Sequence, residues 1–250
     1  MCCRMKTAAY SLVLTISFLL SARADLTILQ KVERAGSATN MTIKLKGDKV
    51  RIEASPQVTT IIDGKTGEIT NLMNDQKTVV RISAEKARAV TNMINKFDAK
   101  KEGAGKVKLT PTGQKETVDG YETEQYTYDG PDFKATYWIA SNYPEGAAIL
   151  AQLQSIKSEF WDAANAGAPD LRDFPGLPIR TRMTTTKHSQ PAKPGGAALG
   201  GATEITTTII SANQNPISDA EFTAPNDFKE TKLPDIFDKK NAAPSTSPNP

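Results

Sequence analysis

The chain has 250 residues, of which 38% are hydrophobic and 24% are charged. This composition provides for a packed core, so it excludes an integral membrane protein and a disordered polyelectrolyte, and the length suits one large domain with appendages. The formal net charge is only +3.

The first 24 residues have the layout of a signal peptide. Arg4 and Lys6 precede an uncharged run over residues 7–22, shorter than the roughly 20 apolar residues that cross a bilayer as a helix. The run ends in Ala22, Arg23 and Ala24, the small-x-small pattern that signal peptidase reads. We predict cleavage after Ala24 and an exported protein, periplasmic or secreted, with no transmembrane segment in the mature chain. The alternative is an uncleaved anchor.

Cleavage would change the chemistry available to the mature chain. Cys2 and Cys3 are the only cysteines and lie in the removed segment, so disulfides, zinc thiolates and thiol catalysis would be excluded. Cleavage would also remove three basic residues, so the number of Lys and Arg would fall to 28 and equal the number of Asp and Glu. A neutral mature chain offers no electrostatic basis for binding nucleic acid.

A hydrophobic period of two runs through the first third of the mature chain. Short turns such as 47–48 and 64–67 separate its segments, which predicts an antiparallel meander with one dry and one wet face. The predicted strands are 26–33, 41–46, 50–53, 59–63, 68–73 and 78–82.

Two segments instead have the period of an amphipathic helix. The first spans 83–100, with Ser83 as its N-cap and apolar residues at steps of three and four. The second spans 145–166 and ends before Gly167 and Pro169. Their apolar stripes consist of Ala87, Val90, Ile94 and Phe97 in the first helix and Ile149, Leu153, Ile156 and Phe160 in the second.

Further strands are predicted at 106–110, 114–118, 121–128, 133–140, 179–188 and 203–211. Two amphipathic helices and about ten strands with one apolar face each must share one core. This pattern predicts an α+β fold, in which one strongly curved antiparallel sheet forms an unclosed barrel and both helices lie on its concave face. The single domain would span 25–233, and the Pro/Ser/Asn-rich residues 234–250 would form a disordered tail.

Several stretches of the chain resemble an exported bacterial family known as the domain of unknown function number forty-four twelve. They are 46–53, 61–78, 120–126, 137–140, 174–178 and 217–222. This resemblance spans nearly the whole mature chain and implies location and fold, without an assigned activity. More loosely, the order of elements resembles the periplasmic lipoprotein-carrier (LolA-like) superfamily, which implies a half-barrel with a groove for acyl chains. No short motif defines that function, so no binding residue is carried over.

Two short motifs mimic catalytic sequences. Gly64, Lys65 and Thr66 resemble the end of a phosphate loop, but the leading glycine is missing and the segment joins two strands, which favours a hairpin turn. Residues 65–67 with 83–86 also mimic two pieces of a penicillin-binding signature, in reversed order. We predict that Ser83 caps a helix rather than acting as a nucleophile.

Other polar and aromatic residues have ordinary structural explanations. His188 is the only histidine, which excludes a multi-histidine metal site, and Glu122 and Glu124 are neighbours on one strand face rather than a pair that flanks a cleft. Carboxylates that could bind calcium are present, but their spacing does not match that of a calcium-binding loop. They are Asp129, Asp132, Asp170 and Asp173. Sheet packing accounts for Tyr126, Tyr128, Tyr137 and Trp138. We therefore predict no catalytic residue, no metal ion and no cofactor.

The leading hypothesis is a non-enzymatic exported protein that binds or carries a lipid or other apolar ligand in the concavity of the sheet. In the alternative, the same side chains fill a solid core and the protein is an envelope structural or interaction module, with an enzyme a distant third. A cavity of about several hundred Å³ would favour the first hypothesis. The candidate ligand-binding residues are Ile43, Leu45, Val50, Ile52, Val90, Ile94, Phe97, Phe133, Tyr137, Ile139, Ile149, Leu153, Ile156 and Phe160.

Overall fold

The computed structural model describes residues 24–89, 92, 108–130, 133–156, 168–185 and 204–231. The strands are β1 Leu26–Arg34, β2 Ser37–Lys46, β3 Lys49–Ser55, β4 Val58–Asp63, β5 Ile69–Met73, β6 Thr78–Ile82, β7 Thr110–Val118, β8 Tyr121–Asp129, β9 Phe133–Ala140, β10 Leu177–Thr185, β11 Glu204–Asn213 and β12 Lys229–Glu230. The helical elements are α2 Gly146–Gln154 and the short 3-10 helices η2 Leu171–Asp173 and η3 Asp219–Phe222.

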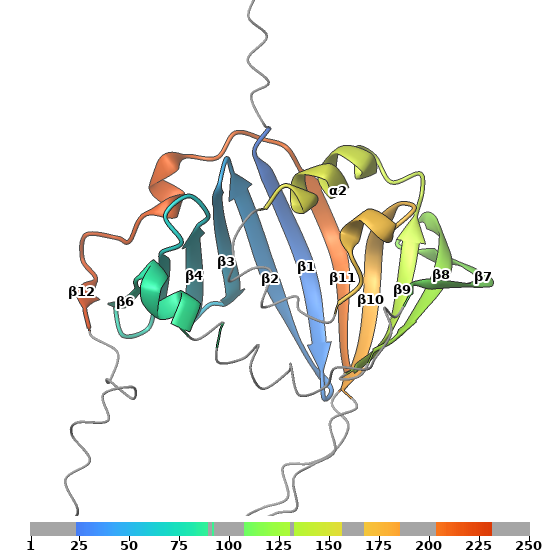
Figure 1. Ribbon diagram of the computed structural model, residues 1–250, viewed down its shortest axis with the longest axis horizontal. Helices are drawn as coiled ribbons and strands as arrows, with labels where there is room; N and C mark the ends of the chain where they lie inside the picture. Colours follow the sequence, from blue (N-terminus) through green and yellow to red (C-terminus); the bar gives the residue numbers. More distant parts are fainter. Residues whose placement is uncertain are drawn as a thin grey trace, which may run out of the picture.

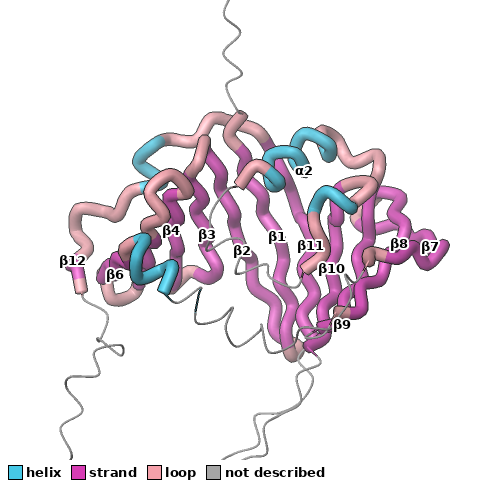
Figure 2. Tube along the Cα trace, viewed as in Figure 1, coloured by secondary structure: helices cyan, strands magenta, loops and turns pink. Residues whose placement is uncertain are grey.

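In these ranges all the strands belong to one curved, unclosed sheet (Figures 1 and 2). Its strand order is β12-β6-β5-β4-β3-β2-β1-β11-β10-β9-β8-β7. Every neighbouring pair is antiparallel except β12 with β6, which run parallel. The predicted fold class, a strongly curved antiparallel sheet with few helices, is confirmed.

The meander predicted from the period of two is confirmed, because β1 to β6 pair in chain order. In place of the strands predicted at 106–110 and 114–118, one continuous strand, β7, spans Thr110–Val118. Residues 108 and 109 are not in a strand, and residues 106 and 107 lie outside the described ranges. The register shifts between Pro111 and Lys115, where Gly113 has a φ of +75°. Gly113 therefore lies at an irregularity of β7, and it does not separate two strands.

Both predicted helices begin where the sequence pattern places them. Residues 84–89 are helical, and the Ser83 hydroxyl accepts a hydrogen bond from the Lys86 amide at 3.4 Å, as expected of an N-cap. In the predicted apolar stripe of the second helix, Ile149 is 1% exposed, whereas Leu153 and Ile156 are only partly buried; Leu150, outside the stripe, is 8% exposed. The second helix is shorter than predicted, because α2 ends at Gln154 with Ser155 as its C-cap, while residues 157–166 lie outside the described ranges. Of the first predicted helix, residues 90, 91 and 93–100 lie outside these ranges.

The main core lies on the inner face of the sheet, defined as the face that carries α2. Its largest cluster joins side chains from the central strands to Ile149 of α2 and to Leu177 and Ile179 of β10. Gly176 lets the chain enter β10 close to the end of β9, because a Cβ there would lie 2.5 Å from the Ala140 carbonyl oxygen. The buried residues of β1 to β4 in this cluster are Leu26, Ile28, Leu45, Val50 and Ile62.

The opposite, outer face is also apolar at one end, which the one-sided strand pattern did not predict. Ile61, Leu72 and Val79 are buried there against Phe222. Phe222 belongs to residues 217–231, here named the C-terminal strap, which packs on the outer face and ends as β12 beside β6 (Figure 1). Pro225 interrupts regular structure in this segment, but it does not prevent the side chains of the segment from covering the sheet.

Charged side chains fix the strap to the outer face. Lys44 Nζ lies 3.2 Å from Glu53 Oε1 and 3.0 Å from Glu221 Oε2, and Arg51 Nε lies 2.8 Å from Glu53 Oε1. Burial alone would raise the pKa of Glu53, but Arg51 and Lys44 outweigh it and hold this pKa below its ordinary value of 4.5. The Glu53 carboxylate therefore stabilises the fold only while it is ionised.

Substitution of Glu53 by glutamine should reveal this linkage. A carboxyl whose pKa is depressed by folding contributes stability above its unfolded pKa, and loses that contribution as the pH falls through the folded pKa. We expect Glu53→Gln to lower the free energy of unfolding by about 1 kcal/mol at pH 7. Urea denaturation at several pH values measures this difference, which should shrink steadily in acid; a difference independent of pH would contradict the assignment.

Candidate functional site: an apolar groove on the inner face

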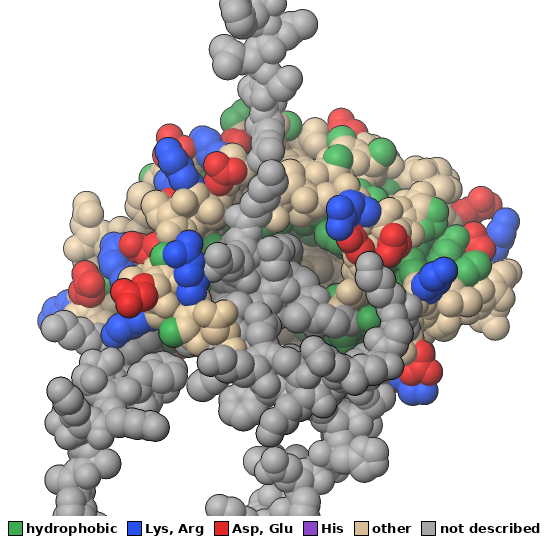
Figure 3. All heavy atoms as spheres, viewed as in Figure 1, with side chains coloured by type: hydrophobic (Ala, Val, Ile, Leu, Met, Phe, Trp, Pro, Cys, Tyr) green, Lys and Arg blue, Asp and Glu red, His purple; other side chains and the backbone are tan. Residues whose placement is uncertain are grey.

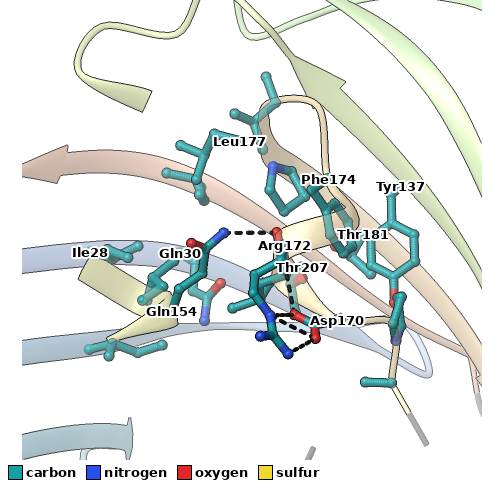
Figure 4. A pocket seen from close by; sticks show the side chains of 18 of the residues that line it. Ile28, Gln30, Tyr137, Gln154, Asp170, Arg172, Phe174, Leu177, Thr181 and Thr207 are labelled. Atoms are coloured by element: carbon teal, nitrogen blue, oxygen red, sulfur yellow. Dashed lines mark hydrogen bonds and ion pairs between the residues drawn. The ribbon is translucent and has the colours of Figure 1, made fainter. Parts of the chain in front are cut away.

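A groove of about 930 Å³ lies between α2, the segment around η2 and the inner face of the sheet (Figure 4). This volume is within the range of about 300–1,000 Å³ that is usual for sites that bind small molecules. The lining residues are Ile28, Gln30, Ile43, Tyr137, Leu153, Gln154, Ile156, Ala168, Pro169, Asp170, Leu171, Arg172, Phe174, Leu177, Pro178, Ile179, Thr181, Thr207 and Ile209.

The floor of the groove comes from neighbouring strands of the sheet. Ile28 of β1 stands opposite Ile43 of β2, and Gln30 of β1 stands opposite Ile209 of β11. Because side chains alternate between the faces of a strand, these positions all project from the inner face. The result is a floor of branched aliphatic side chains that are partly or fully buried.

The opposite wall is held in place by specific contacts. Gln154, the last residue of α2, donates a hydrogen bond from Nε2 to the Leu171 carbonyl at 3.1 Å, which ties α2 to η2 (Figure 4). Phe174, after η2, packs edge-on against Tyr137 with ring centroids 5.0 Å apart. Leu153 and Ile156 complete the wall from the end of α2. The groove is thus formed by elements that are distant in sequence.

The charged groups at the groove neutralise each other. Asp170 and Arg172 are the only charged residues among its described lining, and they form an ion pair in which the Arg172 Nε lies 2.9 Å from both Asp170 carboxylate oxygens. The pKa of Arg172 is raised by this hydrogen bonding. On the face shown in Figure 3, acidic and basic side chains are interspersed. The groove therefore presents no charge of a single sign to a ligand.

Tyr137 is the most strongly perturbed titratable group at the groove. It is 9% exposed, and burial, with a smaller effect of nearby Tyr128, raises the pKa of its phenol well above the ordinary value of 10.0. Its hydroxyl therefore stays protonated and can donate or accept a hydrogen bond, but it does not act as a base near neutral pH.

The candidate ligand-binding residues divide into three groups. Those that line the groove are Ile43, Tyr137, Leu153 and Ile156. Those that are buried in the core clusters or packed against them are Leu45, Val50, Ile52, Phe133, Ile139 and Ile149. Those that lie outside the described residues are Val90, Ile94, Phe97 and Phe160.

Much of the lining was not identified from the sequence. Thr181, Thr207 and Ile209 reach the groove because β10 and β11 insert between β9 and β1, a long-range pairing that local periodicity does not reveal. Phe174 lies between the helix predicted at 145–166 and the strand predicted at 179–188, where no element was predicted. The available signal was the alternation of Thr207 and Ile209 within a strand, which marks one face without naming its neighbours.

The motifs that mimicked catalytic sequences have structural roles. Asp63 Oδ1 accepts hydrogen bonds from the amides of Lys65 and Thr66, both at 2.9 Å, so this segment is the predicted turn between β4 and β5. Trp138 donates a hydrogen bond from Nε1 to Glu116 at 2.7 Å, and the Arg182 guanidinium lies 5.4 Å from its ring centroid. Trp138 is thus engaged within the sheet, as predicted.

The carboxylates considered as catalytic or metal ligands are dispersed. Glu122 is exposed, while Glu124 accepts a long hydrogen bond of 3.4 Å from the Tyr126 hydroxyl. Within the described part of the chain, no three acidic, histidine or cysteine side chains gather as metal ligands. His188 and Asp132 lie outside that part. None of the helices in the described ranges has the length and apolar character needed to cross a bilayer.

A curved, unclosed antiparallel sheet with a helix and an apolar groove on its inner face defines a half-barrel protein. The chain belongs to the family described as domain of unknown function DUF4412, whose model matches residues 26–228. This match confirms the family resemblance recognised from the sequence. No curated protein sequence matches the chain.

Solved structures give distant matches. Two crystal forms of PNGF-II each share 12% identity with a TM-score of 0.36, and the alignments cover 86% and 84% of this chain but 32% of PNGF-II. The chain therefore spans about a third of the length of PNGF-II. A DUF1329 family protein from Desulfovibrio piger shares 9% identity with a TM-score of 0.28, with 81% of this chain and 90% of that protein covered.

Proposed function

We propose that the protein is an exported, non-enzymatic binding protein that holds a lipid chain or another apolar ligand in the groove of the inner face. The observation that carries this proposal is the groove of about 930 Å³, walled largely by aliphatic and aromatic side chains. Burial of apolar ligand surface there would contribute about 25 cal/mol per Å² before the costs of ordering the ligand.

The polar residues at the groove also favour binding over catalysis. The Tyr137 phenol stays protonated, and Asp170 and Arg172 bind each other. A nucleophile activated by a neighbouring base, or two carboxylates with separated pKa values, would be needed for the common hydrolytic reactions. The described lining residues do not form either arrangement.

Cleavage after Ala24 would leave the first contacts of the mature chain intact. Asp25, the first residue after the proposed cleavage, accepts a hydrogen bond on Oδ2 from the Ile217 amide at 2.7 Å, and Leu26 is 0% exposed. The domain proposed to span 25–233, before a tail over 234–250, would therefore keep these contacts after export. Intact mass measurement of the protein from its host envelope should find Asp25 as the N-terminal residue. An N-terminus at Met1 would contradict export by cleavage.

The groove can be tested by filling it. Ile209 lines the groove, whereas its neighbour Ile210 is 53% exposed and lies outside the lining. Both positions are in β11, where an aromatic residue is compatible with the strand. We expect Ile209→Trp to weaken binding of the apolar dye N-phenyl-1-naphthylamine about tenfold or more in a fluorescence titration. The matched variant Ile210→Trp should bind as the unmodified protein does.

Two results would overturn the binding proposal. The first is a wild-type protein that takes up neither the dye nor a fluorescent fatty acid; the second is equal dye binding by both tryptophan variants when both melt cooperatively. Either result would favour the alternative, an envelope structural or interaction module, which the closed core around Leu45, Val50 and Ile149 would also suit. Native mass spectrometry of the protein from its host, with a stoichiometric apolar passenger, would support binding independently.

A further inference from the structure

Three hydroxyl groups form a row across the floor of the groove. Thr181 of β10 stands opposite Tyr137 of β9 on one side and Thr207 of β11 on the other. All three residues line the groove, and adjacent strands are about 4.8 Å apart, so the backbone positions of this hydroxyl row span about 10 Å. It runs perpendicular to the strands, beside the aliphatic part of the floor.

The hydroxyl row has unused hydrogen-bonding capacity. Within the described part of the chain, no side-chain hydrogen bond engages Tyr137, Thr181, Thr207 or the nearby Gln30, although no fully buried side-chain N or O atom there lacks a partner. The polar ends of these side chains must therefore open onto the groove rather than into the core. Hydroxyl and amide groups that face a ligand site select for a ligand that can pair with them.

The row is also uncharged, and the only charges among the described lining residues form a pair. Asp170 and Arg172 bind each other at the groove, so together they present no net charge to an ionic head group. Placing a carboxylate or phosphate in such surroundings would remove its hydration without providing an opposite charge. A neutral ester, hydroxyl or amide can pair with the row without that cost.

We propose that the groove binds a neutral single-chain amphiphile, whose hydrocarbon chain lies along Ile28, Ile43 and Ile209 and whose uncharged hydroxyl- or ester-bearing group pairs with Tyr137, Thr181 and Thr207. A monoacylglycerol has this chemistry. This inference rests on the proposed function, because it names the class of ligand for the same groove.

Competition between ligands of equal chain length tests the inference. The full-length protein loaded with N-phenyl-1-naphthylamine is titrated with 1-monooleoylglycerol, with oleate and with oleoyl lysophosphatidate. We expect monooleoylglycerol to displace the dye at a concentration at least about tenfold lower than either anion. Equal potency of the three ligands, or stronger displacement by an anion, would overturn the inference while leaving apolar binding intact.

Threonine-to-valine variants remove a hydroxyl and keep the shape of the side chain, so they distinguish the contribution of the hydroxyl row from that of the rest of the groove. Thr181→Val combined with Thr207→Val should weaken displacement by monooleoylglycerol about tenfold and reduce its preference over oleate, each measured against the variant's own affinity for the dye. Thr206→Val, on the same strand but on the alternate face, is the matched control and should change neither. If the double variant binds monooleoylglycerol as the wild type does, the row does not recognise the ligand. If the wild type fails to bind the dye, the proposed function itself fails.

Discussion

Leu26→Ala is expected to lower the free energy of unfolding by about 3 kcal/mol or more. Leu26 is 0% exposed and belongs to the inner core cluster, at the start of β1. β1 lies in the middle of the sheet, between β2 and β11, so the surrounding strands cannot easily close on the space left by the removed side chain. Equilibrium urea denaturation followed by tryptophan fluorescence measures the loss.

Ile210→Ala is the control for this prediction. It removes a similar aliphatic side chain from a strand, but Ile210 is 53% exposed, so the change should remain within about 0.5 kcal/mol. Similar losses in the two variants would show that burial at the start of β1 does not determine stability.

Phe222→Ala should have a comparable effect from the opposite side of the sheet. Phe222 is 6% exposed and packs on Ile61, Leu72 and Val79. Truncation of a buried phenylalanine costs about 3–5 kcal/mol, and here it would also free the strap from an apolar patch. We expect a loss of about 3 kcal/mol, measured by urea denaturation, together with increased binding of an environment-sensitive dye such as anilinonaphthalene sulfonate.

Glu221→Gln tests whether charge or apolar contact holds the strap. Glu221 of the strap contacts Lys44 of β2 and is 41% exposed, so its neutralisation should cost less than about 1 kcal/mol. Neither variant should alter ligand affinity in the groove, since the strap and the groove lie on opposite faces. A larger loss for Glu221→Gln than for Phe222→Ala would contradict the packing described here.

Local patterns were sufficient to predict most individual strands. β6 and β9 have the predicted ends, because clear alternation within each is bounded by turn residues. The strap was missed because Pro216 and Pro225 read as breakers, and the sequence contains no local sign that Phe222 would cover Ile61 and Leu72. Only the folded sheet brings these residues together.

The groove was predictable in kind, but only in part in its residues. The periodicity that identified Ile43 and Leu153 also selected Leu45 and Ile149, which lie in the core. The spacing of apolar residues indicates which face of an element is buried. It does not distinguish side chains that pack against each other from side chains that line a cavity. The hydroxyl row was not predicted, because it depends on the register among β9, β10 and β11.

The place of β1 in the sheet has a consequence for synthesis. Thr27, near the start of the domain, pairs with Asn213 of β11, so the centre of the sheet cannot be completed until nearly the whole domain has been made. Non-local pairing of this kind slows folding, because a long loop must close before the contacts form. A nascent chain with this topology therefore cannot fold strand by strand as it emerges, and it completes its sheet only after β11 has been synthesised.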